Sequence, residues 1–552
     1  MWNKHPKALP YLFFSEMWER FGYYLMIGIF TLYLKDVKNG FAMNEAESAD
    51  LYGTFIALVF LTPFLGGLLA DRYFGYKKSI VFGGILMGIG YCMMGIHSLP
   101  VLYIAMTFVI VGNGFFKPNI STLLGNVYSV PEHIHQKDDG YNIFYMGINV
   151  GAFICNFFGA ALQILLGWEW AFMAAGIGMF IGVIVFLIGT KHFIGFDQKK
   201  GVQPDDMPML KIVLLILVPS IIGGVIGYLI KGTTSIENPN GNIFGSDSTD
   251  AFIFACLPVI YFYSSLYRKA NKEEKRPIAA LLAIFAVVIL FWAVFKQNGS
   301  ALNTWADRYT DRQVEGTTEK VCETLKQSKS ISYTKDSVAS YDQYFRLMKV
   351  KGVVQKEFNY PLYYRNVKTE NLPQEGNSIS VWSTNLSQSI NPGWVIILTP
   401  LVVAFFTWLR RRKKEPSTPT KIAFGLFVSA LSALVMLAAV KAGENGAEKV
   451  SVWWLIGCYG VITIGELFLS PMGLSLVSKL SPPRITALMM GGWFLSTSIG
   501  NKLSGVLASM WDKYEDKSNF FLLNCGLLLV ATLLLFAILK WLNTIMKEKN
   551  IH

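Results

Sequence analysis

The chain of 552 residues carries a net charge of +12, and 53% of its residues are hydrophobic while only 16% are charged. This composition argues against a soluble enzyme. Apolar runs of about 20 residues, the length that a membrane-spanning helix needs, recur along most of the chain. We therefore read the positive charge as a signal of membrane topology rather than of nucleic-acid binding. The six cysteines show no metal-binding spacing, so we predict no metal site.

The apolar runs predict an all-α membrane protein with fourteen spanning helices. Clusters of lysine and arginine fall in alternate loops, for example at residues 77–78 and 410–414. By the positive-inside rule this alternation predicts that both termini are cytoplasmic. The predicted spans are 9–35, 50–70, 78–97, 100–125, 140–166, 168–190, 208–231, 250–268, 277–308, 392–412, 418–441, 451–478, 483–510 and 518–545.

Residues 309–391 interrupt this pattern because they are polar and contain no spanning run. A connection of this length is too long for an ordinary loop, and the predicted topology places it outside the cell. A small folded cap and a partly disordered loop are two open alternatives for it. Neither a phosphate-binding loop nor a hydrolase nucleophile motif occurs in the chain, so we predict that the protein is not an enzyme.

The first predicted span holds ionisable residues at positions where lipid would tolerate none. Glu16, Glu19 and Arg20 lie within five positions, and at 100° per residue they share one helix face with Tyr23 and Ile27. Charged side chains inside a membrane are costly and normally face a partner or a water-filled cavity. A static ion-pair clamp is one interpretation; we favour a proton or substrate relay because other spans also carry charges.

Three further charges lie within predicted spans, at Lys117, Lys296 and Glu466. Together with those of the first span they make three acids and three bases, whose charges sum to zero. A neutral, mutually paired set is what a low-dielectric cavity tolerates, and a transporter rearranges such a set when it changes the side on which it is open. Pro118 and Pro471 lie near two of these charges, which predicts kinked or broken helices there.

Six stretches in the predicted spans and loops resemble the motifs of one transporter family. They are similar to those of the proton-dependent oligopeptide transporter (POT) family of the major facilitator superfamily, in its prokaryotic form. The resemblance covers nearly all of the chain except residues 309–391. The stretches are EMWERFGYY (16–24), GGLLADRYFGYKKSI (66–80), GNGFFKPN (112–119), FYMGINVGAF (144–153), FWAVFKQNGSALNTWADR (291–308) and GELFLSPMGLS (465–475).

The resemblance implies the major facilitator fold, with two six-helix bundles around a central cavity. The bundles correspond to residues 1–190 and 277–545, two extra helices to residues 208–268, and an extracytoplasmic insertion to residues 309–391. It also implies a proton-coupled symporter of the cell (inner) membrane that imports di- and tripeptides by alternating access. The expected partners are peptides, protons and the lipid bilayer, without nucleic acid or cofactor. The sequence does not indicate an oligomeric state.

The resemblance also assigns roles to individual residues by their motif positions. Glu466 is expected to bind the amino terminus of the peptide, and Asp307 is expected to form a salt bridge at the outer gate. Proton coupling is expected of Glu16, Glu19, Arg20 and Lys117. Substrate binding is expected of Tyr24, Lys117, Asn149, Trp292, Glu466 and Ser470. Apart from what the resemblance implies, we expect Asp71, Arg72, Lys77 and Lys78 to latch the cytoplasmic gate rather than to bind substrate.

Three positions depart from the family pattern. Ile27 stands where the family usually has arginine, Lys296 where it has an acid, and Phe60 where it has tyrosine. We infer that Lys296 replaces the missing arginine as the anchor of the substrate carboxylate. The same departures keep open an alternative, a transporter of this fold with altered proton coupling and another substrate, such as a modified peptide, an amino-acid conjugate or another organic anion. A non-transporting receptor is less favoured, because it needs no charge relay within the membrane.

Overall fold

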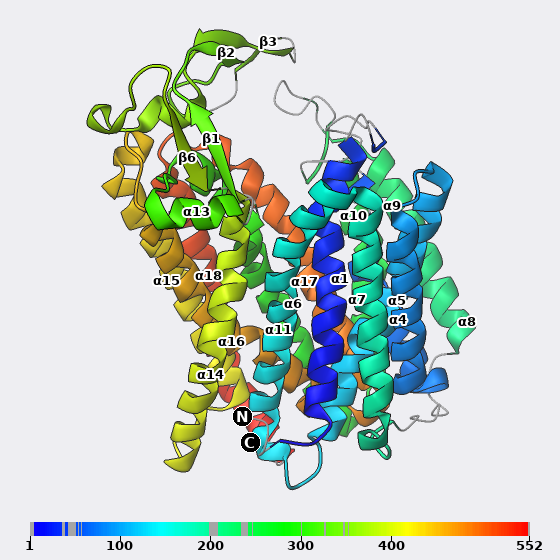
Figure 1. The fold of residues 1–552 in the computed structure, drawn as a ribbon. Coiled ribbons are helices and arrows are strands. Elements are labelled where there is room, and N and C mark those ends of the chain that lie inside the picture. Colours follow the sequence, from blue (N-terminus) through cyan, green and yellow to red (C-terminus); the bar gives the residue numbers. More distant parts are fainter. Residues whose placement is uncertain are drawn as a thin grey trace.

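The computed structural model describes the chain apart from a set of short segments. The molecule is a body of long, roughly parallel helices with a small strand-containing cap at one end (Figure 1). Both termini lie at the other end, which we name the terminus end; the end with the strands is the cap end. The segments outside the described residues are 1–4, 36–38, 42–50, 53–54, 57, 198–207, 233, 235–240, 245–246, 300, 325–326, 346–347, 351–352, 383 and 550–552.

The helices before residue 190 pack together as the N-terminal half of the body. α1 packs against α6 and α7, and α4 packs against α5 and α7. A π-helical turn at Ala70–Phe74 joins α3 to the loop before α4. The helices are α1 (Leu9–Lys35), α3 (Pro63–Leu69), α4 (Tyr76–Met94), α5 (Leu99–Val127), α6 (Lys137–Leu166) and α7 (Trp168–Gly189).

The helices after residue 270 form the C-terminal half. α15 packs against α16 and α18, α11 packs against α17 and α18, and α14 packs against α16. The helices are α11 (Lys272–Phe295), α12 (Ala301–Arg308), α14 (Ser387–Arg411), α15 (Thr418–Ala442), α16 (Val452–Leu480), α17 (Thr486–Ser509) and α18 (Lys517–Glu548). Between the halves in sequence lie α8 (Met209–Ile212), α9 (Val218–Leu229) and α10 (Asp247–Lys269). Of these, α9 packs against α10, which contacts α11 and α17.

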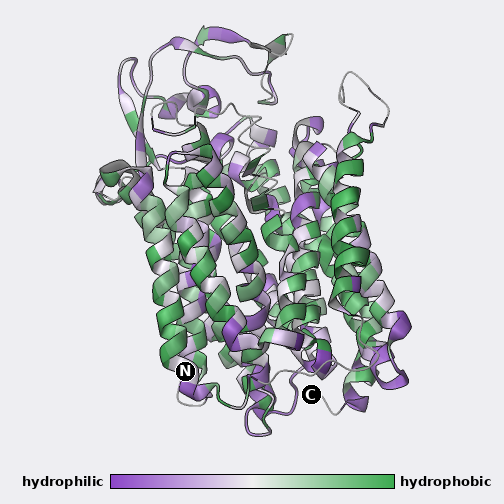
Figure 2. Cartoon of the chain, turned by 90° about the vertical axis from the view of Figure 1, so that its right-hand side faces the viewer, coloured by the Kyte–Doolittle hydropathy of each residue, from purple (hydrophilic) through white to green (hydrophobic). Residues whose placement is uncertain are grey.

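The surface of the helical body is apolar. Eight of the described helices are long and apolar enough to cross a membrane. Figure 2 shows hydrophobic residues along the length of the helices and hydrophilic residues at both ends and in the cap. Ile184 and Leu533 leave 54% and 68% of their area exposed at this surface. Such residues find apolar surroundings in a bilayer, where helices satisfy their own backbone hydrogen bonds.

The described residues of the inserted segment that precede α14, within 309–386, form a folded cap. Strand β1 pairs antiparallel with β6, β2 with β5, and β3 with β4. A small apolar cluster of Tyr363, Tyr364 and Val381 lies at its centre. The elements are α13 (Gly316–Thr324), β1 (Ser328–Ser332), β2 (Asp336–Ala339), β3 (Lys349–Val350), β4 (Val353–Val354), β5 (Lys356–Asn359) and β6 (Ser378–Trp382).

Two differences from the predicted helix boundaries bear on the site. The predicted span 277–308 is interrupted, because α11 ends at Phe295 and a 3₁₀ turn occupies Lys296–Gly299 before α12 begins. The polar stretch KQNG explains the interruption, since asparagine and glycine favour turns over helix. In contrast, α5 and α16 continue through Pro118 and Pro471, so helix breaks expected there are absent from these two described helices. Helix α14 begins five residues earlier than predicted, at Ser387.

Candidate functional site

A cavity of about 560 Å³ lies between the N-terminal and C-terminal halves. Its volume is in the range of pockets that enclose small organic ligands. Three members of the predicted proton-coupling set, Glu16, Arg20 and Lys117, line this cavity. The fourth, Glu19, is fully buried. Every predicted substrate-binding residue lines the cavity: Tyr24, Lys117, Asn149, Trp292, Lys296, Glu466 and Ser470.

The charged residues of α1 form a compact cluster on the cavity wall. Arg20 donates hydrogen bonds to both carboxylate oxygens of Glu19, and its Nε lies 3.5 Å from Oε1 of Glu16. The three side chains are at most 4% exposed. One guanidinium thus serves two carboxylates, so with both acids ionised the cluster carries one net negative charge. Arg20 thus pairs with Glu16, four residues earlier on the helix, and also with the adjacent Glu19.

Lys117 extends from α5 into the cavity. Its ammonium lies 4.3 Å from the ring centroid of Phe60 and 4.8 Å from that of Phe494. Among the described residues it forms no ion pair. Because Phe494 belongs to α17, the lysine reaches from the N-terminal half to a side chain of the C-terminal half.

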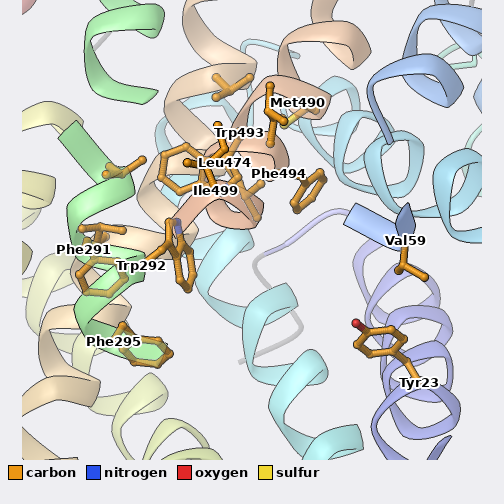
Figure 3. Close-up of a cluster of buried hydrophobic side chains, with 14 of the residues drawn as sticks. Tyr23, Val59, Phe291, Trp292, Phe295, Leu474, Met490, Trp493, Phe494 and Ile499 are labelled. Atoms are coloured by element: carbon orange, nitrogen blue, oxygen red, sulfur yellow. The ribbon is translucent and has the colours of Figure 1, made fainter. Parts of the chain in front are cut away.

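Lys296 enters the cavity from the point at which α11 ends. Its ammonium lies 5.8 Å from the ring centroids of Trp292 and Phe295, and within the described part of the chain it has no ion-pair partner. Trp292 is 6% exposed, and its indole N–H has no hydrogen-bond partner in the same part of the chain. Figure 3 shows these rings on α11, across from Tyr23 of α1, with Trp493 and Phe494 of α17 nearby.

Glu466 of α16 is the carboxylate that faces the cavity from the C-terminal half. The hydroxyl of Tyr145 donates to its Oε1, and the amide of Asn391 donates to its Oε2 at 2.8 Å. The Asn391 amide also donates to the hydroxyl of Thr463 at 2.9 Å. Because Tyr145 lies on α6, its hydrogen bond joins the two halves across the cavity.

Sequence reasoning assigned no role to Tyr145 or Asn391. Tyr145 precedes Asn149 by four residues on the same helix, so both side chains occupy one helix face, and that spacing could have identified it. Asn391 was placed at the end of the inserted segment because the predicted span began one residue later. Pro392 favoured a predicted helix start at that residue, although α14 already begins at Ser387 and proline is tolerated in the first turns of a helix.

Asp71 joins the two halves at the terminus end of the body. It lies in the π-helical turn at Ala70–Phe74 and accepts a hydrogen bond from the hydroxyl of Tyr76 at 2.7 Å. It also accepts one at 3.2 Å from the backbone amide of Leu488, in the first turn of α17. A carboxylate at a helix N-terminus is stabilised by the helix dipole. Of the other predicted gate residues, Arg72 is buried beside it, while Lys77 and Lys78 are exposed.

A second connection at the terminus end was missed by sequence reasoning. We name it the Asp138 cluster: Asp138 and Asp139 of α6 with Arg410, Lys421 and Lys479 of the C-terminal half. The Asp138 carboxylate lies 2.8 Å from Lys421 Nζ and 2.9 Å from Lys479 Nζ. Arg410 lies 2.9 Å from Asp139. The adjacent acids 138–139 and the basic run 410–414 were visible in sequence, but nothing there paired them.

Glu415 completes the Asp138 cluster from the loop between α14 and α15. Its carboxylate lies 2.5 Å from Arg410 Nε and 2.7 Å from Lys421 Nζ. Burial raises the pKa of Glu415, but hydrogen bonds from Arg410 and the charge of Lys421 outweigh it and hold the pKa below its ordinary value. The carboxylate therefore stays ionised and shares the cations with the two aspartates.

Among the described residues, the bonds of the Asp307 carboxylate do not cross between the two halves. Its carboxylate lies 2.9 Å from Arg312 and accepts a hydrogen bond from Thr384 at 3.0 Å, and both partners belong to the cap. The expected gate salt bridge is thus a bond within the C-terminal part, and it anchors the cap to α12.

Nearby, burial and the charge of Arg312 lower the pKa of Lys449 to about 7.

Comparisons with known proteins, like the fold and the cavity, indicate a membrane transporter. The sequence profile of the POT family matches residues 77–321 and 372–522. The dipeptide and tripeptide permease A of Proteus mirabilis (strain HI4320) is 30% identical over 94% of this chain and 88% of its own length. The transporter YclF of Bacillus subtilis (strain 168) is 28% identical over 99% of this chain and 95% of its own length.

Solved structures agree with the sequence comparisons. The crystal structure of a peptide transporter POT in complex with sulfate is 27% identical, covers 99% of this chain and 97% of its own, and aligns with a TM-score of 0.63. A POT family transporter solved with a thioalcohol-conjugated peptide shares the fold at 23% identity and a TM-score of 0.66. The chain therefore belongs to the POT family, and it is a multi-pass membrane transporter of peptides with the major facilitator fold rather than an enzyme.

Proposed function

We propose that the protein is a proton-coupled symporter that imports di- and tripeptides by alternating access. In this proposal it resides in the cell (inner) membrane with the terminus end in the cytoplasm. The proton gradient drives it without a cofactor. The permease A of Proteus mirabilis, named for dipeptides and tripeptides, supports the size of the substrate.

The charges of the cavity carry this proposal. A peptide at neutral pH has an ammonium group at one end and a carboxylate at the other. Glu466 offers a carboxylate from the C-terminal half, while Lys117 and Lys296 offer ammonium groups. Opposite charges at separate positions in a low-dielectric cavity complement a zwitterion and reject molecules that have only one of its ends.

Protons would be carried by the acids of the same cavity. The α1 cluster has two carboxylates for one guanidinium, so a proton on Glu16 or Glu19 leaves a neutral cluster. Such a protonation lowers the attraction between α1 and Lys117, whose ammonium forms no ion pair among the described residues and is available to the substrate. Glu466 is the third acid that can take part. The Asp138 cluster and Asp71 would form the cytoplasmic gate, because both bond the halves together at the terminus end.

The direct test is uptake into proteoliposomes. Vesicles that hold the purified protein are given a pH gradient, acidic outside, and labelled dialanine, trialanine or alanine. We expect uptake of both peptides, stimulated by the gradient, and none of the amino acid. Uptake that ignores the gradient would refute proton coupling. The absence of any peptide uptake would favour the second candidate, a transporter of another organic anion. The supporting observation for it is Lys296, which has no ion-pair partner among the described residues.

Lys296 is proposed to anchor the carboxylate of the peptide. It occupies the end of α11, beside a tryptophan whose N–H is unpartnered among the described residues. We expect Lys296→Ala to abolish dialanine binding and Lys296→Arg to retain part of it, because the guanidinium keeps the charge but changes the geometry. Equilibrium binding to the purified variants measures this, and wild-type binding by Lys296→Ala would contradict it.

A further inference from the structure

The charged groups that face the cavity are not matched one to one, and the mismatch points to a class of substrate. Lys117 and Lys296 reach the cavity from opposite halves, while the carboxylates that line it belong to Glu16 and Glu466. The bonds that each group already makes within the protein decide what remains for a ligand.

Lys117 is available to a ligand because its nearest carboxylates on α1 are bound elsewhere. Arg20 lies 3.5 Å from Glu16 and takes both oxygens of Glu19, so the acids of α1 share this arginine. The Lys117 ammonium instead lies over the rings of Phe60 and Phe494, and it forms no ion pair within the described residues. Cation–π contacts are weaker than a charge-assisted hydrogen bond. A carboxylate can therefore bind this ammonium without displacing a paired acid.

Lys296 offers a second position of the same kind. Its ammonium contacts the aromatic rings of Trp292 and Phe295, and among the described residues it forms no ion pair. The indole N–H of Trp292 is buried at the cavity wall without an acceptor in the described chain. A buried donor without an acceptor costs free energy until a ligand supplies one. Lys296 and Trp292 together thus suit an anionic group.

Glu466 is the cavity's position for a cationic group. Its carboxylate accepts hydrogen bonds from Tyr145 and Asn391, which are neutral, and among the described residues no cation is bonded to it. A ligand therefore meets two positions for anions, in opposite halves, and one for a cation. A peptide with neutral side chains carries a single carboxylate and fills only one of the two anion positions.

We infer that the preferred substrates are short peptides with a second carboxylate, supplied by an aspartate or glutamate side chain. The main-chain carboxylate binds Lys296 and Trp292, the side-chain carboxylate binds Lys117, and the amino terminus binds Glu466. This inference rests on the proposed peptide transport and narrows its substrate class. A ligand of this kind contacts both halves at once, so its binding draws them together around the cavity.

Equilibrium binding to the purified full-length protein tests the inference with an isosteric pair of ligands. Alanyl-glutamate and alanyl-glutamine differ only in an acid and an amide, and dialanine serves as the reference. At pH 7 we expect alanyl-glutamate to bind about tenfold more tightly than alanyl-glutamine, which corresponds to one charge-assisted hydrogen bond. Equal affinities, with dialanine still bound, would overturn the inference and leave the proposed function intact. If none of the three peptides binds, both are overturned.

Two variants of Lys117 assign the second position. Both change the absolute affinity, so the measured quantity is the ratio of the two dissociation constants. We expect Lys117→Gln to bring this ratio close to one, since it removes the charge at similar size, and Lys117→Arg to retain most of it. A tenfold ratio that persists in Lys117→Gln would overturn the role of Lys117. A thermal unfolding curve of each variant, compared with that of the wild type, verifies that it is folded.

Discussion

Two groups of lysines at different depths of the molecule are used in opposite ways. Lys421 and Lys479 of the Asp138 cluster have carboxylate oxygens at 2.7–2.9 Å. Lys117 and Lys296 of the cavity contact aromatic rings, and neither is ion-paired in the described residues. All four side chains lie at the boundary between the halves. The difference indicates which charges hold the protein together and which are left for a ligand.

Lys421 and Lys479 hold the two halves together at the terminus end, because their shared partner Asp138 lies in the opposite half. Asp138 belongs to α6, whereas Lys421 and Lys479 belong to α15 and α16. Opening the body at the terminus end must therefore separate buried opposite charges, unless water or another group replaces the partner. Removing one member of a buried pair costs about 3–5 kcal/mol, because the other charge is left uncompensated. We therefore expect the terminus end to stay closed until a ligand that binds in the cavity supplies the free energy to separate these charges.

The largest effect is expected from Asp138→Asn. This change removes a carboxylate from Lys479, whose side chain is 6% exposed, and one of two acids from Lys421. We expect the free energy of unfolding to fall by about 3 kcal/mol, at the lower end of the range for a broken buried pair. Thermal or denaturant unfolding of the purified protein in detergent measures the loss.

Asp139→Asn is the matched control for this prediction. The partner of Asp139 is Arg410, which is 27% exposed and keeps Glu415 at 2.5 Å. A partly exposed pair with a substitute partner contributes about 0–1 kcal/mol. If both variants lose stability equally, the comparison between the Asp138 cluster and the cavity lysines fails, because burial would then not set the strength of the connection.

An intermediate effect is expected from Tyr145→Phe, which removes the hydrogen bond between α6 and Glu466. A hydrogen bond to a charged group contributes about 1.5–3 kcal/mol, so the ligand-free protein should lose about that stability. The peptide ammonium can then bond the vacated Oε1 of Glu466. We therefore expect saturating dialanine to stabilise this variant by more than it stabilises the wild type, as measured by thermal unfolding with and without ligand. Equal stabilisation by dialanine would show that Tyr145 and the ligand do not compete.

The sequence was a good guide to the cavity and a poor one to the Asp138 cluster, for a physical reason. Charges within apolar spans are recognisable because lipid does not tolerate them, and Glu16, Lys117, Lys296 and Glu466 all line the cavity. Acids and bases near helix ends are ordinary in any sequence. Asp138 meets Lys421 across 283 positions, and only the packing of the halves pairs them.

The helix boundaries near the site show a similar limit. Lys296 was predicted within a continuous helix, but the turn that starts at this residue ends α11 and directs the lysine into the cavity. Hydropathy does not detect such a break, since the apolar run and the motif continue on both sides of it. For residues 309–391 the sequence does not distinguish a folded cap from a partly disordered loop, because short strands in polar segments give only weak periodicity.

A pH-dependent effect is expected from Lys449→Met at the cap end. The Lys449 ammonium donates to the carbonyl of Arg308 at 3.1 Å and lies 4.2 Å from the ring centroid of Tyr363. Burial, with Arg312 nearby, lowers the pKa of this lysine to about 7, whereas its ordinary value is 10.5. Between these values the folded protein has released a proton that the unfolded chain still binds. Stability should therefore rise with pH over this interval.

The variant should lack this contribution, because methionine cannot bind the proton. We expect the melting temperature of the wild type to increase from pH 7 to pH 10 relative to that of Lys449→Met. Lys320→Met, which changes an exposed lysine of α13, is the control and should follow the wild type. Parallel curves for wild type and Lys449→Met would mean that Lys449 keeps its proton when folded. Lys449 would then be a charged lysine with sufficient internal partners, like those of the Asp138 cluster, rather than one that burial neutralises.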